Sequence, residues 1–200
     1  MHHTQRPAAD TEQLKPWTDL LEQLSPGAVN LTIGLIAGSR THNERAALDR
    51  LAQAALQLTS GGGLLVRLNL GNEAVSKRQL RSARASEQSP PPIPSPLGRW
   101  REVCISVQLG SRAPKSLELL PRWLAQWKRE YARILIDLGP VDQAVCRTLG
   151  RYCDSSLLLL GPETCASPAW LQRHIDHLTQ CDVTLSGSIV LATESPAIAI

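Results

Sequence analysis

The segment from Ala132 to Pro140, Ala-Arg-Ile-Leu-Ile-Asp-Leu-Gly-Pro, restricts the fold of this chain more than any other. A short, continuous apolar run that ends in Gly-Pro is typical of a strand buried on both faces, as in a parallel sheet. Asp137 lies where this strand ends, at the edge where open α/β sheets bind their ligands. Two roles are open for Asp137. It caps the next turn, or it is paired, hydrated or metal-bound, because a lone buried carboxylate is costly.

Similar apolar runs alternate with helical patterns along the rest of the chain. We expect further strands at residues 31–37, 64–70, 102–109, 155–160 and 186–192. We expect helices at residues 44–58, 116–131, 142–152 and 168–180. A strand, a helix and a second strand in succession imply parallel pairing with a right-handed crossover. The predicted fold class is therefore α/β, a doubly wound, mostly parallel sheet with helices on both faces.

Changes in composition divide the chain into segments. Residues 1–30 form an N-terminal segment with a short amphipathic helix over 16–24, whose apolar stripe docks on the domain's own sheet or on another chain. Residues 31–193 form a single domain, and residues 194–200 form a tail that is ordered only in part. Within the domain, residues 77–98 form a basic and proline-rich loop, because a proline run is incompatible with a packed helix.

Composition and charge favour a soluble cytoplasmic protein. The formal charge of +3 is too small to indicate nucleic-acid binding by itself, and no apolar run reaches the roughly 20 residues of a membrane span. Five cysteines without a C-x-x-C pair indicate reduced thiols, most of them in the core. The basic cluster from Lys77 to Arg84 is interpreted as a solvated loop; contact with phosphates, acidic lipids or DNA is the alternative.

His174 and His177 are three residues apart on the predicted helix 168–180. An i, i+3 pair of histidines can share a metal ion, but no third or fourth ligand of suitable spacing accompanies it. We therefore expect both histidines to face solvent.

From Thr32 to Thr193 the chain resembles the cytoplasmic kinase domain of the bacterial tyrosine kinases that work with polysaccharide co-polymerases. These kinases are deviant-Walker P-loop ATPases, related to septum-positioning and plasmid-partition ATPases. The resemblance lies in the order and spacing of the segments, and residues 133–140 match the family's magnesium-site strand, "VIIDTPP". It implies a P-loop NTPase-like domain in which Asp137 is the catalytic and metal-binding carboxylate of any active site.

The residues that would form the nucleotide site depart from the family pattern. The family's phosphate loop, "SARPGEGKTT", aligns without a gap with residues 37–46 of this chain. The family's lysine is replaced by Glu44, and the hydroxyl residue that ligates magnesium is replaced by Arg45. Two carboxylates of the family's second strand become Arg67 and Asn69. The predicted degenerate loop consists of Gly38, Ser39, Arg40, Thr41, His42, Asn43, Glu44 and Arg45.

The exchange of lysine for glutamate has a large electrostatic effect on phosphate binding. Two unit charges about 4 Å apart interact by about 4 kcal/mol at an effective dielectric constant near 20. The exchange removes one such attraction and adds a repulsion of similar size. Thr41 and Glu44 have the spacing of a capping box, in which the protein's own carboxylate occupies the helix N-terminus in place of a phosphate. We favour this interpretation over cryptic nucleotide binding.

The resemblance and its departures together predict a catalytically inactive, pseudokinase-like domain that acts as an interaction or regulatory module in exopolysaccharide synthesis or export. The expected partner is a membrane polysaccharide co-polymerase or a kinase-like paralogue, with a homo-oligomer also possible. Nucleic acid is not expected, and membrane association would come only through a partner. No cofactor or metal ion is expected. The alternative is a divergent ATPase or tyrosine kinase that uses Asp137 with ATP and magnesium.

Overall fold

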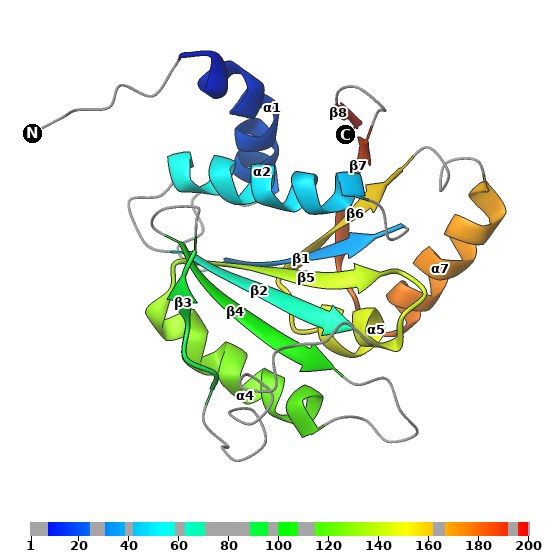
Figure 1. Ribbon diagram of the computed structural model, residues 1–200. Coiled ribbons are helices and arrows are strands. Elements are labelled where there is room, and N and C mark those ends of the chain that lie inside the picture. The colour runs from blue at the N-terminus through cyan, green and yellow to red at the C-terminus, as the bar shows by residue number, and fades with distance from the viewer. Residues whose placement is uncertain are drawn as a thin grey trace, which may run out of the picture.

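The computed structural model of the chain describes residues 8–24, 31–38, 42–58, 63–70, 89–95, 100–107, 115–161, 167–191 and 196–199 (Figure 1). Eight strands of these residues form one sheet in the order β3-β4-β2-β5-β1-β6-β7-β8. The six strands from β4 to β7 in this order run parallel, whereas β3 and β8 pair antiparallel at the two edges. The prediction of a doubly wound, mostly parallel α/β fold is confirmed.

The six parallel strands begin and end within two residues of their predicted positions. They are β1 Leu31–Ala37, β2 Gly63–Leu70, β4 Trp100–Val107, β5 Arg133–Pro140, β6 Ser155–Leu160 and β7 Leu185–Leu191. Every residue of β1 and β6 is buried, because neighbouring strands pair on both sides and helices cover both faces. Continuous apolar runs therefore located the centre of the sheet correctly.

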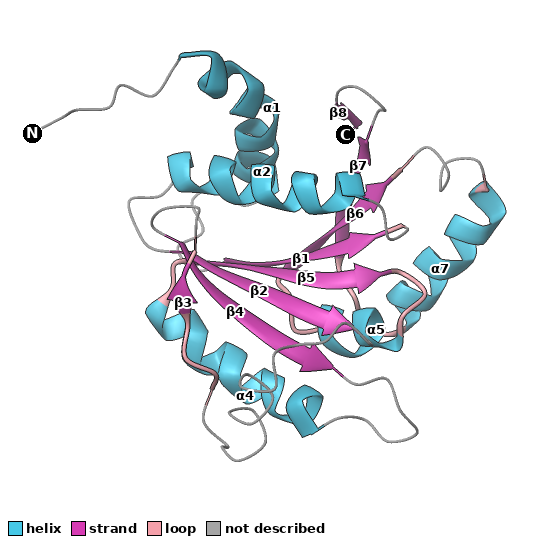
Figure 2. Cartoon of the chain, in the orientation of Figure 1, coloured by secondary structure: helices cyan, strands magenta, loops and turns pink. Residues whose placement is uncertain are grey.

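Helices cover the two faces of the sheet as separate layers (Figures 1 and 2). One face carries α1 Ala8–Leu24 and α2 His42–Leu58, and the other carries α4 Lys115–Glu130, α5 Ala144–Gly150 and α7 Pro168–Gln180. The helix α5 is shorter at both ends than the predicted 142–152. None of the described helices is long and apolar enough to cross a membrane.

The N-terminal helix α1 differs from its prediction in length, and it docks within the domain. We expected it to begin at Pro16, but it begins at Ala8 and continues through that proline. Burial of Leu14, two residues before Pro16, against the same core outweighs the local preference for a helix start at proline. Trp17 is only 1% exposed and lies in one apolar cluster with Leu51 of α2 and Ile33 of β1.

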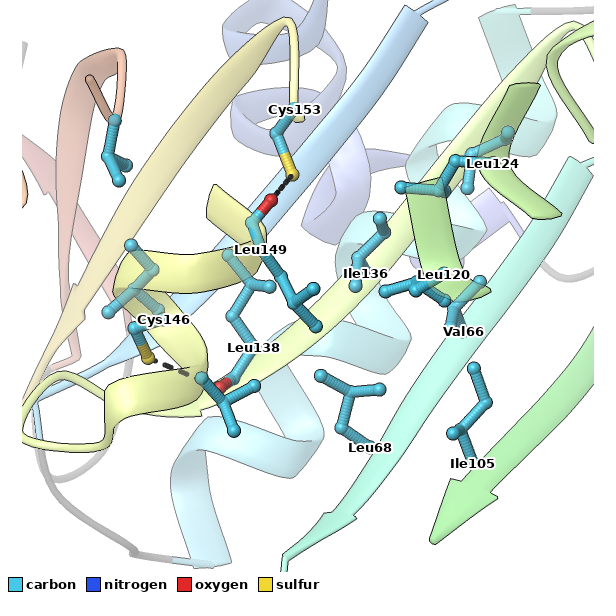
Figure 3. Close-up of a cluster of buried hydrophobic side chains, with 14 of the residues drawn as sticks. Val66, Leu68, Ile105, Leu120, Leu124, Ile136, Leu138, Cys146, Leu149 and Cys153 are labelled. Atoms are coloured by element: carbon cyan, nitrogen blue, oxygen red, sulfur yellow. Dashed lines mark hydrogen bonds between the residues drawn. The ribbon is translucent and has the colours of Figure 1, made fainter. Parts of the chain in front are cut away.

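The second apolar cluster lies between the sheet and the helices α4 and α5 (Figure 3). Leu120 and Leu124 of α4 lie over Val66 of β2 and Ile136 of β5, and Leu149 of α5 extends the cluster towards β1 and β6. The apolar side chains of α4 are therefore part of the core.

The two edge strands were not predicted. β3 Ile93–Pro94 falls within the predicted proline-rich loop, and β8 Pro196–Ala199 falls within the predicted tail. Each pairs with a strand that would otherwise expose a row of unpaired backbone groups, namely β4 and β7. Two- and four-residue strands that contain proline lack the apolar alternation by which a longer strand is recognised. The basic cluster from Lys77 to Arg84 lies outside the described residues.

The cysteines in the described residues divide into buried and more exposed environments. Burial, together with the nearby Asp137 carboxylate, raises the pKa of Cys146 far above its ordinary value. Burial, together with the charge of Asp154, raises the pKa of Cys153 to about 12. Cys104 on β4 is exposed.

We expect iodoacetamide at pH 8 to alkylate Cys104 in the native protein while Cys146 and Cys153 stay unmodified. The reason is that only a thiolate reacts, and the two buried thiols remain protonated at this pH. Peptide mapping by mass spectrometry before and after unfolding measures the difference. Alkylation of Cys146 in the native protein as fast as that of Cys104 would contradict the burial described above.

Candidate functional site

The candidate site lies at the carboxyl ends of β1, β5 and β2, at the centre of the sheet. β1 runs between β5 and β6, and α2 begins at His42, four residues after Gly38. Gly38 is buried, and its N–H donates to the carbonyl oxygen of Leu159 on β6 over 2.7 Å. A strand, a short loop and a helix in this position provide the frame in which P-loop proteins bind phosphate.

Asp137 is held in a tight turn at the end of β5. Its Oδ1 accepts a hydrogen bond from the backbone N–H of Gly139 over 3.1 Å, and Gly139 has φ of +74°, a conformation that favours glycine. The pairing of β1 with β5 shifts at this point, since Leu35 pairs with Asp137 but Ile36 pairs with Gly139. Such a bulge re-aims the side chains next to it. The turn-capping role considered for Asp137 is therefore present in the structure.

The buried thiol of Cys146 contacts the backbone of this turn. Its Sγ lies 3.2 Å from the carbonyl oxygen of Leu138 and 2.9 Å from that of Pro140, so the thiol donates into the backbone of the bulge (Figure 3 shows the contact with Leu138). Because Cys146 lies in α5, this contact ties the first turns of α5 to the end of β5.

Arg67 on β2 is the centre of a charged cluster beside Asp137. Its Nη2 donates to Oδ1 of Asp49 on α2 over 2.8 Å, and its Nε donates to Oε1 of Glu102 on β4 over 3.0 Å. Arg67 also pairs in register with Asp137 on β5. Residues paired in register on parallel strands project to the same face, so Asp137 and Arg67 are neighbours beneath α2.

The electrostatic environment of Arg67 favours its charge. Burial alone would lower the pKa of Arg67, but the hydrogen bond to Asp49 and the charges of Glu102, Asp49 and Asp137 together raise it. The side chains of Arg67 and Glu102 are 19% and 15% exposed, so solvent screens this pair only in part. The guanidinium is consequently a permanent cation at this position.

The residues around Asp137 do not fit a divalent metal ion. Magnesium takes oxygen ligands and keeps several water molecules, whereas an arginine carries only N–H donors and the same sign of charge as the metal. Arg67 stands directly beside the one carboxylate that the resemblance assigns to magnesium. Among the described residues, no group of three or more acidic, histidine or cysteine side chains is arranged to hold a metal ion.

Several predicted site residues fall where the structure describes no side chain. Ser39, Arg40 and Thr41 lie outside the described residues, and the side chains of Asn69 and of residues 42–45 are not described. The capping-box hypothesis for Thr41 and Glu44 therefore stays a prediction. It agrees with the helix start, since α2 begins one residue after Thr41.

The two histidines of α7 lie apart from this site and in different environments. His177 is exposed as expected, but His174 is half-buried with its ring 4.3 Å from the ring of Trp170. Burial and the nearby positive charges of His177, Arg147 and Arg173 lower the pKa of His174, against an opposing effect of Asp142. Packing against Trp170, one helical turn away, explains why His174 is not solvent-facing.

Sequence reasoning missed two members of the charged cluster, Asp49 and Glu102. The signal was present in β2, where Arg67 interrupts an otherwise apolar strand. A charged side chain in a buried strand requires partners of opposite sign, so an arginine at this position predicts acidic residues on the neighbouring elements. The sequence gives no means of choosing these two among the 18 acidic residues, because the choice depends on strand order.

The comparison with known proteins rests on solved structures, since no protein-family model and no curated protein matches the sequence. The kinase domain of the Escherichia coli tyrosine kinase ETK superposes with a TM-score of 0.67 at 17% identity, over 94% of this chain and 79% of that one. The chain has the fold of the bacterial tyrosine-kinase domains.

Two further structures have a similar fold. The kinase domain of VpsO superposes with a TM-score of 0.65 at 19% identity, over 91% of this chain and 95% of that one. MinD in the MinC:MinD cell division complex of Aquifex aeolicus gives 0.58 at 16% identity, over 82% and 70% of the two chains. The predicted resemblance to the deviant-Walker P-loop ATPases, in their tyrosine-kinase branch, is thus confirmed at the level of the fold.

Proposed function

We propose that this chain is a catalytically inactive, tyrosine-kinase-like domain that acts as an interaction or regulatory module, in exopolysaccharide synthesis or export. The observation that carries the proposal is the position of Arg67. It lies in register with Asp137, and it is tied to Asp49 and Glu102 by hydrogen bonds of 2.8 and 3.0 Å. A fixed cation beside the surviving carboxylate opposes the binding of magnesium, and nucleotide hydrolases need that ion to neutralise the phosphates.

Replacements in the predicted phosphate loop also oppose the binding of a magnesium nucleotide. Glu44 takes the place of the phosphate-binding lysine in the alignment with the kinase pattern, and Arg45 takes the place of the magnesium-ligating hydroxyl. Each replacement alone weakens the site, and together with Arg67 they remove the charge pattern that a magnesium nucleotide requires. The strand–loop–helix frame persists because the core beneath it is apolar and independent of nucleotide.

Because this domain is proposed not to bind a nucleotide, we propose that it acts by binding a protein partner. The solved structures similar to this chain include a chimerical protein, CapA2B2, and the MinC:MinD cell division protein complex. By analogy, we propose a membrane polysaccharide co-polymerase or a kinase-like paralogue as the partner of this chain. Any association with the membrane would then be peripheral, through that partner.

Calorimetric titration of the whole chain with magnesium-ATP and with magnesium-ADP tests the proposal. We expect no heat of binding at nucleotide concentrations up to the millimolar range, because Arg67 and Glu44 oppose the metal and the phosphates respectively. The matched variant Asp137→Ala is expected to behave like the wild type.

Micromolar binding that weakens in Asp137→Ala would overturn the proposal. It would establish the second candidate, a divergent ATPase or tyrosine kinase that uses Asp137 with ATP and magnesium. Asp137 favours this candidate because it lies at the carboxyl end of a central strand, the edge at which such enzymes bind their ligands.

A further inference from the structure

A buried cation lies at the edge of the sheet where the parallel strands begin, opposite the edge that carries Asp137. Arg133 is the first residue of β5 and is only 7% exposed. Its Nε and Nη1 atoms are buried, and neither has a hydrogen-bond partner among the described residues. Because a guanidinium stays protonated in proteins, a positive charge is buried here with two of its three nitrogens unsatisfied.

Arg133 borders the apolar cluster that lies beneath α1 and α2. Leu135 belongs to that cluster, and residues two apart in a strand project to the same face of the sheet. Gly63 of β2 pairs in register with Arg133 on one side and with Trp100 of β4 on the other. The Trp100 ring covers Gly63, since a Cβ atom there would lie 2.6 Å from the ring. The indole of Trp100 therefore extends over β2 in the direction of Arg133.

This part of the core contains further hydrogen-bond donors without partners. The indole Nε1 atoms of Trp17 and Trp100 are buried in the same cluster, and neither has a hydrogen-bond partner among the described residues. An indole and a guanidinium can only donate hydrogen bonds, and the other side chains of the cluster are apolar. The chemistry that this environment lacks is a hydrogen-bond acceptor, and next to a cation the best acceptor is an anion.

The charge that the chain itself supplies does not replace such an anion. Burial lowers the pKa of Arg133, and the charge of Glu22 on α1 opposes this effect only in part. Glu22 is exposed, so water screens its charge. Burying a charge without a hydrogen-bonded partner is costly, and a bound carboxylate would remove that cost by pairing with the guanidinium.

We propose that Arg133 anchors a binding site for the carboxylate of a small organic acid, at the edge of the sheet where the parallel strands begin. A carboxylate carries one negative charge and balances one guanidinium, whereas a phosphate carries more charge and is costlier to take out of water. Since so little of Arg133 is exposed, the site admits a small anion and excludes the surface of a protein. This inference goes beyond the proposed function, because it concerns the opposite edge of the sheet from Asp137.

Thermal unfolding of the whole chain in sodium acetate, compared with sodium chloride at equal ionic strength, tests the proposal. We expect acetate to raise the melting temperature of the wild type in a saturable manner, by at least about 2 °C, because a ligand that binds only the folded state stabilises it. Arg133→Met removes the charge and is expected to show no saturable rise. Arg101→Met is the matched control, since it removes an exposed arginine from the start of β4 and is expected to behave like the wild type.

A titration with acetate, followed by intrinsic tryptophan fluorescence, measures the affinity directly. Trp17 and Trp100 lie in the cluster that Arg133 borders, so occupation of the site is expected to change their emission. We expect the dissociation constant of Arg133→Met to be at least about tenfold higher than that of the wild type, since a charge-assisted hydrogen bond is lost. Inorganic phosphate is expected to bind more weakly than acetate.

Replacing an unpaired buried cation with an apolar side chain is often neutral or stabilising, so Arg133→Met is expected to fold. If it does not, Arg133→Lys keeps the charge but loses the planar fork that pairs with a carboxylate, and it is expected to bind acetate more weakly than the wild type. No saturable effect of acetate on the wild type, or the same effect in the wild type and the Arg133 variant, would overturn the inference. Phosphate binding as tight as that of acetate would overturn the assignment of a carboxylate.

Discussion

Replacing Trp17 with alanine is expected to lower the free energy of unfolding by about 3–5 kcal/mol, the range for truncating a large buried aromatic side chain. Trp17 is 1% exposed and is the largest side chain that α1 contributes to the core it shares with α2 and β1. Urea denaturation monitored by circular dichroism measures the loss. Hydrogen exchange over residues 8–24 should accelerate at the same time, because α1 would detach before the sheet unfolds.

The variant Trp17→Phe is the matched control. It keeps most of the ring volume and removes an indole Nε1 that has no hydrogen-bond partner among the described residues. We expect it to cost less than about 1.5 kcal/mol, since the packing loss is small and an unpaired buried donor disappears. A loss below 1 kcal/mol in Trp17→Ala itself, on the scale of a surface substitution, would mean that α1 is held weakly and is available to another chain.

Replacing Gly63 with alanine is the second change for which we expect a large loss, about 1–3 kcal/mol, from overpacking. A Cβ atom at this position would lie 2.6 Å from Cε3 and Cζ3 of Trp100. The Trp100 ring is itself 1% exposed, so it has no free space into which to move. Denaturation by guanidinium chloride, with the midpoint as the readout, measures the effect.

The change of Gly187 to alanine provides the comparison in the same sheet. A Cβ atom there would meet only Cδ2 of Leu157, at an ordinary contact distance of 3.7 Å. We expect a change within about 0.5 kcal/mol, or a slight gain from reduced freedom of the unfolded chain. Equal losses in the two variants would indicate a general cost of replacing strand glycines and would refute the role given to Trp100.

Most of the fold was predictable because the signals that specify it are local. The buried strands β1 and β6 are short apolar runs between turn residues, and the ends of both agree with the predictions. The start of α1 was wrong because Pro16 is a strong local signal, while the burial of Leu14 that overrides it depends on the assembled core. β3 and β8 were missed for a similar reason, since only the neighbouring strand makes these short segments into strands.

The candidate site was predictable in part. Asp137 and Arg67 were identified in advance, the first from its place at a strand end and the second from its departure from the family pattern. Asp49 and Glu102 were not identified, because their contact with Arg67 depends on which elements lie beside β2, and this follows from the strand order of the sheet. Pairwise contacts between distant elements are the information that a single sequence does not carry.

Both margins of the parallel sheet are closed by short antiparallel strands, and this has a consequence for how the domain associates. The proline at Pro94 offers no N–H to an incoming strand, and β8 occupies the side of β7 that would otherwise be open. Edge strands of only two and four residues offer few backbone groups to an incoming strand, which disfavours continuous β-structure between two molecules, the usual beginning of fibrous aggregates. We therefore expect a partner to bind helices and loops of this domain rather than to add a strand to its sheet.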